Sequence, residues 1–174
     1  MKLQPGDFFC TRNPMALGRA INFIEKLWSK DNEAEYSHAG IITDSAGTTL
    51  EALWTIRGNE LDAYAGQKVI IGRWIHMTPE RFQKGLDEVQ DDVGRIYPFW
   101  RLLFFMAPGA AKWISSGRFT VCSELVCQFL LGAGFKEIGR WQGWDPEDVA
   151  DMIQKWRTVE VLYEGEWVPE LLEP

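Results

Sequence analysis

Hydrophobic and polar positions along the chain alternate with two different periods, which predicts a mixture of strands and helices. Alternation with a period of two runs through YSHAGIIT, residues 36–43, and through TTLEALW, residues 48–54. The short segment DSAG between them predicts a β-hairpin. PGDFFCTR, residues 5–12, and KVIIGRWI, residues 68–75, predict two further strands. TVEVLYEGEWVPE, residues 158–170, predicts a strand pair that turns at its Glu-Gly step.

Apolar residues recur at helical spacing in four other segments. Residues 14–28 place Leu17, Ile21, Ile24 and Trp28 on one face, and Pro14 suits a first turn. The remaining expected helices start after Thr78, near Cys122 and after Asp145, and the Cys122 helix ends at Gly132 and Gly134. We therefore expect an α+β fold. It has an antiparallel sheet of five or six strands, with the Cys122 helix packed on one face.

Length and composition favour one ordinary globular domain across residues 1–174. Hydrophobic residues are 46% and charged residues 25% of the chain, as in other soluble domains. The net charge of -7 argues against a general binder of nucleic acid or anionic membranes, since both need a basic face. The nine tryptophans serve as core or as stacking surface, and core is the safer expectation for most of them.

The sequence shows no targeting or membrane-spanning segment. MKLQPGDFFCTRNPM lacks the basic start and apolar run of a secretory signal. LLFFMAPGAA, residues 102–111, is too short to span a bilayer and is broken by Pro-Gly. We expect a cytoplasmic protein, or one that is released by lysis or delivered by a particle.

The chain contains three cysteines, an odd number without C-x-x-C spacing, which fits neither a disulfide framework nor a zinc site. Phosphate-cradling glycines are absent as well, and we expect no metal and no cofactor. Cys122 and Cys127 lie about 140° apart on one helix, so they cannot serve one site together. Cys127 lies mid-helix and is expected in the core. Cys122 begins the helix, where the macrodipole favours a thiolate, yet its direction suits a core cysteine equally well.

A catalytic thiol needs a base that is oriented by a third group. Only His38 and His76 are available, and no acidic residue has an obvious strand register with His76. Alternation places Tyr36 and His38 on one strand face. If the hairpin loop has an even number of residues, Glu51 shares the strand face of His38. If Thr43 then pairs with Thr48, Glu51 lies diagonal to His38 and within reach of its ring. The alternatives are that His38 is hydrogen-bonded to a backbone group and that Glu51 is a solvated strand residue.

These segments resemble the NlpC/P60 superfamily of papain-like cysteine hydrolases. VCSELVCQFL is similar to its nucleophile helix, PGDFFCTR to its Gly-Asp strand and SHAGIIT to its histidine strand. Both strands precede the cysteine here, as in the circularly permuted branch of YiiX-like hydrolases and lecithin retinol acyltransferase-like proteins. LEA after the histidine strand also resembles YiiX-like members. The chain departs from the pattern at Tyr97-Pro98 and in the aromatic insert, residues 97–116.

The resemblance implies a cysteine hydrolase with Cys122 as nucleophile, His38 as base and Glu51 as third member. The oxyanion would be stabilised by the N–H groups of Cys122 and Ser123, and the Tyr36 hydroxyl either assists or simply packs. The implied substrates are cell-wall peptides or small aminoacyl conjugates. Two alternatives stay open. One is acyl transfer between lipids, with Phe104, Phe105 and Trp113 on the acyl chain, and the other is a non-catalytic binding module.

Overall fold

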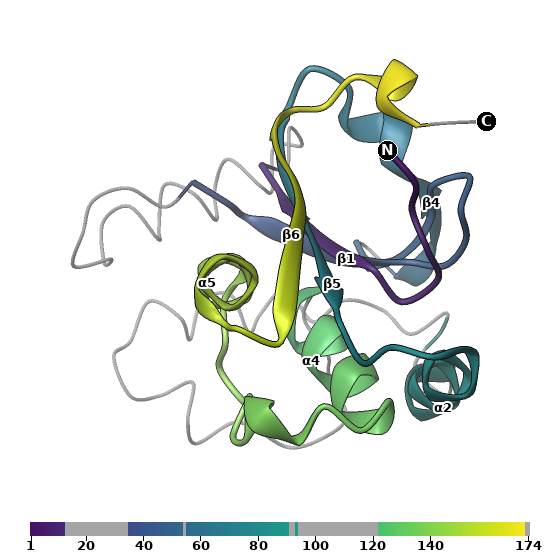
Figure 1. Cartoon of the computed structure of the whole chain (residues 1–174), viewed down its shortest axis with the longest axis vertical. Helices are drawn as coiled ribbons and strands as arrows, with labels where there is room; N and C mark the ends of the chain where they lie inside the picture. The colour runs from purple at the N-terminus through teal and green to yellow at the C-terminus, as the bar shows by residue number, and fades with distance from the viewer. Residues whose placement is uncertain (13–34, 54, 91–92, 94–121, 173–174) are drawn as a thin grey trace.

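The computed structural model describes residues 1–12, 35–53, 55–90, 93 and 122–172. They form an α+β fold around a six-stranded antiparallel sheet with the strand order β4-β3-β2-β1-β5-β6 (Figure 1). The strands are β1 (Phe8–Thr11), β2 (His38–Ile42), β3 (Thr48–Ala52), β4 (Ile56–Glu60), β5 (Lys68–Trp74) and β6 (Val159–Glu166). The helices are α2 (Pro79–Gln90), α4 (Cys122–Gly132) and α5 (Pro146–Lys155), with 3-10 turns η1 (Leu61–Tyr64), η3 (Lys136–Ile138) and η4 (Pro169–Leu171).

The predicted hairpin is confirmed, with an even loop. Gly40 pairs with Glu51, and the Thr43 N–H donates to the Thr48 carbonyl at 2.8 Å. Since side chains alternate along each strand, this register puts Glu51 on the same face as His38 and diagonal to it.

The prediction of a strand pair in residues 158–170 is wrong. β6 is one continuous strand, and Gly165 pairs with Val69 instead of turning. A Cβ at Gly165 would lie 3.0 Å from the Tyr163 hydroxyl, so this glycine leaves room for the neighbouring ring. The edge of β5 offers the segment hydrogen-bond partners from Lys68 to Trp74, with one register shift at Ile71/Gly72, and this pairing outweighs the weak Glu-Gly turn signal.

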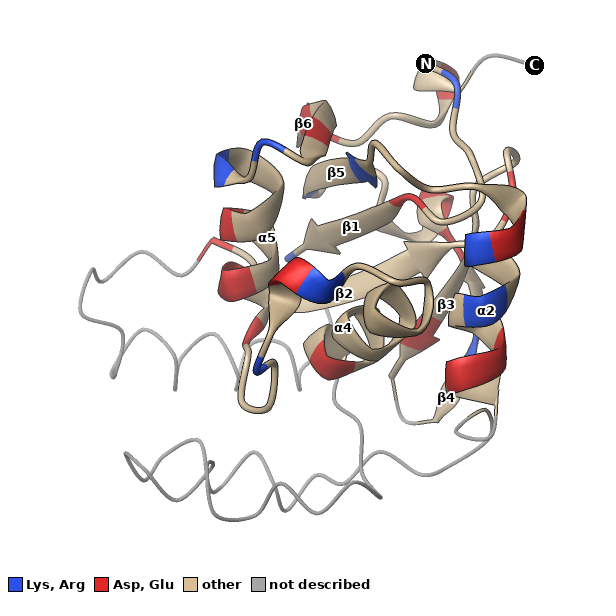
Figure 2. Ribbon diagram, turned by 60° about the horizontal axis from the view of Figure 1, so that its bottom comes forward, with Lys and Arg blue, Asp and Glu red and all other residues tan. Residues whose placement is uncertain are grey.

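The two faces of the sheet carry separate cores. Alternation in β1 sends Phe8 and Cys10 to the face covered by α4 and α5, and Phe9 to the other. α4 lies against β2 and α5 against β6, while α2 packs on α4 (Figure 2). The second core gathers residues from both ends of the chain around the fully buried Trp167. The nucleophile candidate therefore lies on a helix held between the sheet and another helix.

α5 starts after Asp145, as expected, and Asp145 caps its first turn. The Asp145 carboxylate accepts the Asp148 N–H at 2.9 Å, the Asp148 carboxylate accepts the Asp145 N–H at 3.0 Å, and Pro146 fills the first helical position. This reciprocal pair satisfies two backbone donors that the helix itself cannot satisfy.

Replacing Asp145 with alanine is expected to lower the free energy of unfolding by about 1 kcal/mol, because the first turn loses its acceptor. Urea unfolding measures the change. Asp151→Ala is the matched control, since Asp151 forms an exposed ion pair with Lys155 on the same helix. Its expected cost is about 0.5 kcal/mol or less. Equal costs for the two variants would contradict a stabilising role for the cap.

Candidate active site

Cys122 and His38 meet where a helix and a strand begin. Cys122 is the first residue of α4 and His38 the first of β2, and α4 packs on β2. The thiol and the imidazole are hydrogen-bonded. Both side chains are nearly buried, with 5% and 2% of their surface exposed. The arrangement places a thiol beside a base at the amino end of a helix, where backbone N–H groups lack intrahelical partners.

Glu51 is the second partner of the imidazole. Its carboxylate is 2.6 Å from His38 Nε2, and its side chain is completely buried. The hairpin register brings the two residues together, because β2 and β3 are adjacent and antiparallel. Cys122, His38 and Glu51 thus form one hydrogen-bonded series, with the imidazole in the middle.

Among the residues that the structure describes, three further side chains donate to the Glu51 carboxylate. The hydroxyls of Thr49 and Tyr64 form short hydrogen bonds to it, and the Asn59 amide donates at 3.3 Å. Sequence analysis missed these three residues. Thr49 could have been found, because a residue two positions before Glu51 shares its strand face. Asn59 and Tyr64 depend on β4 and η1, which the pattern did not predict.

The electrostatics favour a charged imidazole beside a charged carboxylate. Burial lowers the pKa of His38, but its hydrogen bonds with Cys122 and Glu51, together with their charges, prevail and raise it to about 10. Burial raises the pKa of Glu51, but the hydrogen bond and charge of His38 and the two hydroxyl donors bring it below the usual value. Burial and the adjacent Glu51 charge raise the pKa of the Tyr64 hydroxyl, which therefore stays a donor.

The other two thiols have different surroundings. Cys10 and Cys127 are fully buried, and burial raises the pKa of each thiol well above the usual value. The Cys10 thiol donates to the Pro146 carbonyl at 3.4 Å. Neither is hydrogen-bonded to a histidine in the part of the chain that the structure describes. Cys127 lies in the core, as predicted.

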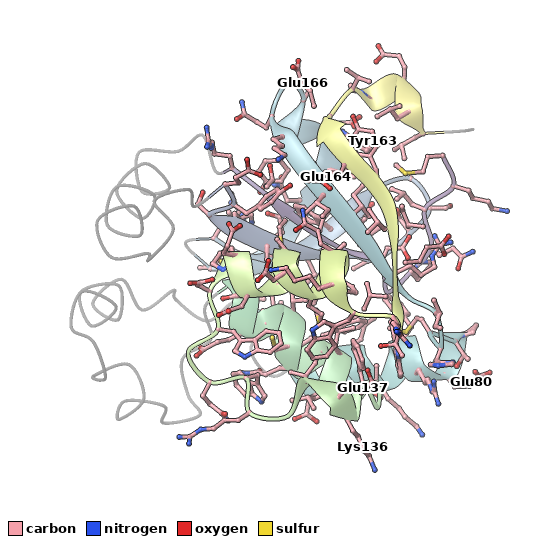
Figure 3. All side chains as sticks on the ribbon, turned by 60° about the vertical axis from the view of Figure 1, so that its left-hand side comes forward. Glu80, Lys136, Glu137, Tyr163, Glu164 and Glu166 are labelled. Atoms are coloured by element: carbon pink, nitrogen blue, oxygen red, sulfur yellow. The ribbon has the colours of Figure 1, made fainter. Side chains whose placement is uncertain are left out.

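The side chains of Ser123 and Tyr36, the two remaining candidates, hydrogen-bond to groups other than the His38 imidazole. The Ser123 hydroxyl donates to the Trp144 carbonyl at 2.7 Å, and Glu124 accepts the Gly143 N–H at 3.3 Å. These bonds fasten a loop to the first turn of α4. The Tyr36 hydroxyl donates at 3.4 Å to Glu164, which lies on β6 (Figure 3). Tyr36 precedes β2, so strand alternation does not govern it, and it packs in the core that contains Ala39.

The competing base lies outside this series. His76 follows β5 and is exposed, and its ring contacts the edge of Trp74 at 6.0 Å between centroids. The predicted helix in residues 14–28 and the aromatic insert, residues 97–116, lie outside the described residues. The same holds for Phe104, Phe105 and Trp113, the residues assigned to an acyl chain.

Comparisons with known proteins support the fold. No family model and no curated protein matches the chain. Among solved structures, the crystal structure of the metalloprotein yiiX from Escherichia coli O157:H7 is similar, with a TM-score of 0.61. The match covers 95% of this chain and 99% of that chain, at 15% sequence identity. The chain has a YiiX-like fold. At this identity the likeness extends to the fold alone.

The description of yiiX as a metalloprotein raises the question of whether this site suits a metal. Within the described ranges, no group of three or more His, Cys, Asp or Glu residues is placed to hold an ion. His38 interacts with both Cys122 and Glu51, and the hydroxyls of Thr49 and Tyr64 donate to the Glu51 carboxylate. Cys122, His38 and Glu51 therefore do not form a group of ligands around one ion.

None of the described helices has the length and apolarity needed to cross a bilayer.

Proposed function

We propose that this chain is a cysteine hydrolase of the permuted papain-like, NlpC/P60 type, which cleaves an amide bond through a thioester intermediate. The observation that carries the proposal is the hydrogen-bonded series from Cys122 through His38 to the buried Glu51. A nucleophile, a base in contact with it and an acid that orients the base are the parts that covalent acyl transfer requires. The YiiX-like fold and the order of the sequence motifs agree with this type.

In the proposed mechanism, the proton of the Cys122 thiol lies on His38 at rest, in agreement with the raised pKa of the imidazole, and the thiolate attacks the carbonyl carbon of the amide. The carbonyl oxygen becomes an oxyanion, which the backbone N–H groups of Cys122 and Ser123 stabilise. His38 then donates its proton to the leaving amine as the C–N bond breaks. Water, deprotonated by His38, attacks the thioester, and the acid leaves as the Cys122 thiolate is restored beside protonated His38. Glu51 stabilises the imidazolium throughout.

The substrate class follows from the resemblance, as peptides of bacterial cell walls or small aminoacyl conjugates. A wall substrate would be met after lysis or delivery by a particle, and a small conjugate in the cytoplasm. Glutamate at the third position also favours a hydrolase, because the acyltransferase branch usually has a second histidine there.

The test is the rate of iodoacetamide labelling at each cysteine between pH 5 and 9, measured by peptide mass spectrometry. At pH 6, Cys122 is expected to react at least about tenfold faster than Cys10 and Cys127, whose thiols are held protonated by burial. His38→Ala is expected to slow Cys122 by about 100-fold, the lower end of the usual contribution of a general base.

His76→Ala is the matched control and is expected to leave all three rates unchanged. If Cys122 reacts no faster than Cys127, or is insensitive to the loss of His38, the hydrolase proposal fails and a binding module is favoured. Given a reactive Cys122, release of amines from peptide amides supports the hydrolase. Activity only on lipid esters, stimulated by detergent, would instead indicate an acyltransferase.

A further inference from the structure

Glu51 receives more hydrogen bonds than its contact with His38 accounts for. Thr49 and Asn59 donate to Oε1, while Tyr64 and His38 donate to Oε2. A carboxylate has about four acceptor positions, so these four donors satisfy it. The donors come from β2, β3, β4 and η1, and their convergence on one buried side chain is a property of the fold.

We propose that Tyr64 and Thr49 are positioning residues whose hydroxyls clamp Glu51 as an ionised carboxylate directed at His38. The clamp itself does not depend on the reaction, whereas its effect on catalysis rests on the proposed function. Each hydroxyl binds a different carboxylate oxygen, so together the two prevent rotation of the group about its last bond.

The ionised form of Glu51 needs this support because its side chain has no exposed surface. Burial alone would favour the protonated acid, which donates a hydrogen bond and would leave at least one of its four donors without an acceptor. Hydrogen bonds to the charged form reverse this preference. The lowered pKa of Glu51 agrees with the geometry.

Packing holds the Tyr64 ring in place independently of its hydroxyl. The ring contacts Phe9 at 5.6 Å and the His38 ring at 5.9 Å between centroids. Tyr64→Phe therefore removes the hydrogen bond while it keeps the ring. Thr49→Val removes the second hydroxyl at similar volume, and Thr49→Ser retains it.

The experiment follows the ring carbons of the two histidines by NMR from pH 8 downward, in protein labelled at those carbons. The His38 signal is expected to show an acid inflection when the adjacent Glu51 takes up a proton. Tyr64→Phe and Thr49→Val are each expected to move this inflection up by about one pH unit, a tenfold change in proton affinity, because a charged acceptor loses a donor. Thr49→Ser is expected to restore the wild-type position.

Two controls separate the shift of the His38 inflection from a general disruption of the folded structure. His76 is exposed, and its signal is expected to be the same in wild type and in all variants. Tyr163→Phe removes a tyrosine hydroxyl that donates to the Glu166 carbonyl on β6, and it is expected to leave the His38 inflection unchanged (Figure 3).

The clamp is overturned if the acid inflection stays in place in both Tyr64→Phe and Thr49→Val, or if the wild-type inflection lies at or above the ordinary pKa of glutamate. Iodoacetamide labelling of the same variants distinguishes the two proposals. A shifted inflection with an unreactive wild-type Cys122 supports the clamp and contradicts the hydrolase. If Cys122 is reactive and neither substitution changes how its labelling rate falls at acid pH, the result supports the hydrolase and contradicts the clamp.

Discussion

Replacing Glu51 with glutamine is expected to lower the free energy of unfolding by about 3 kcal/mol near pH 5.5. Removal of one partner of a buried ion pair usually costs about 3–5 kcal/mol, because the other charge stays buried without compensation. Here that partner is His38, 2% exposed and 2.6 Å from the carboxylate. Because neutral His38 can still hydrogen-bond to the amide, we expect the lower end of the range.

The amide also fits the site poorly as a hydrogen-bond acceptor. Glutamine has one acceptor oxygen, whereas Glu51 accepts from donors on both of its oxygens. Whichever way the amide is turned, its NH₂ group faces side chains that donate to Glu51 in wild type, and these must turn or lose a proton in order to accept from it. A buried donor without an acceptor costs about 1–3 kcal/mol, so the hydrogen-bond network contributes to the loss as well as the charge.

The free energy of unfolding that Glu51→Gln loses should depend on pH, with a decrease on both the acid and the alkaline side. The pKa of Glu51 is lowered from its usual 4.5, so its stabilising effect is present above that value and disappears as the pH falls through the pKa in the folded protein. The pKa of His38 is raised from its usual 6.5 to about 10, so its effect is complete below 6.5 and disappears as the pH rises toward 10. The difference between wild type and variant is therefore greatest between about pH 4.5 and 6.5.

Urea unfolding of wild type and Glu51→Gln, repeated from pH 4 to 10, measures this profile. Asp151→Asn is the control, because its ion pair with Lys155 is exposed and contributes little at any pH. A difference that stays constant across the range would show that the His38–Glu51 pair is not charged in the folded protein.

Local patterns in the sequence predicted the part of the site that lies on consecutive elements, on the condition that the hairpin loop has an even number of residues. The hairpin register follows from strand alternation and loop length, and it alone brings Glu51 to His38. The start of α5 follows from Asp145 and Pro146. In each case the interacting groups lie within a few residues or on neighbouring strands, so local rules are enough.

The features that the sequence did not predict depend on contacts between segments that lie far apart in the chain. β6 runs straight through Gly165 because it pairs with β5, which lies about 90 residues earlier in the chain, as its register with Lys68–Trp74 shows. Tyr64 and Asn59 reach Glu51 only after β4 has folded back along β3. Neither residue carries a signature of this role in the sequence, since a tyrosine or asparagine near a turn is ordinary.

Replacing Phe129 with alanine is expected to lower the free energy of unfolding by about 3–5 kcal/mol, the usual cost of removing a buried aromatic ring. Phe129 is fully buried on α4, and its ring meets the edge of Phe82 on α2 at 5.8 Å between centroids. Its loss leaves a cavity between α4 and α2, which the close packing of the two helices does not allow them to fill.

The packing of these helices is closest at Gly85 of α2. A Cβ added there would lie 2.6 Å from the Phe129 ring and 2.7 Å from the Phe129 carbonyl oxygen. In wild type, Gly85→Ala is therefore expected to cost about 1–3 kcal/mol through overpacking. In the Phe129→Ala background the clash with the ring is gone and only the clash with the carbonyl remains. The same substitution should then cost less, and the two changes are not additive.

Urea unfolding of wild type, the two single variants and the double variant measures this coupling, and iodoacetamide labelling of Cys122 relates it to the site. α4 carries Cys122 at its first residue, so a helix that packs less firmly on α2 and the sheet should hold the thiol less firmly against His38. Labelling of Cys122 at pH 6 is expected to slow in Phe129→Ala under conditions where the protein stays folded. An unchanged rate would show that the contact between Cys122 and His38 depends on the packing of α4 against β2 alone.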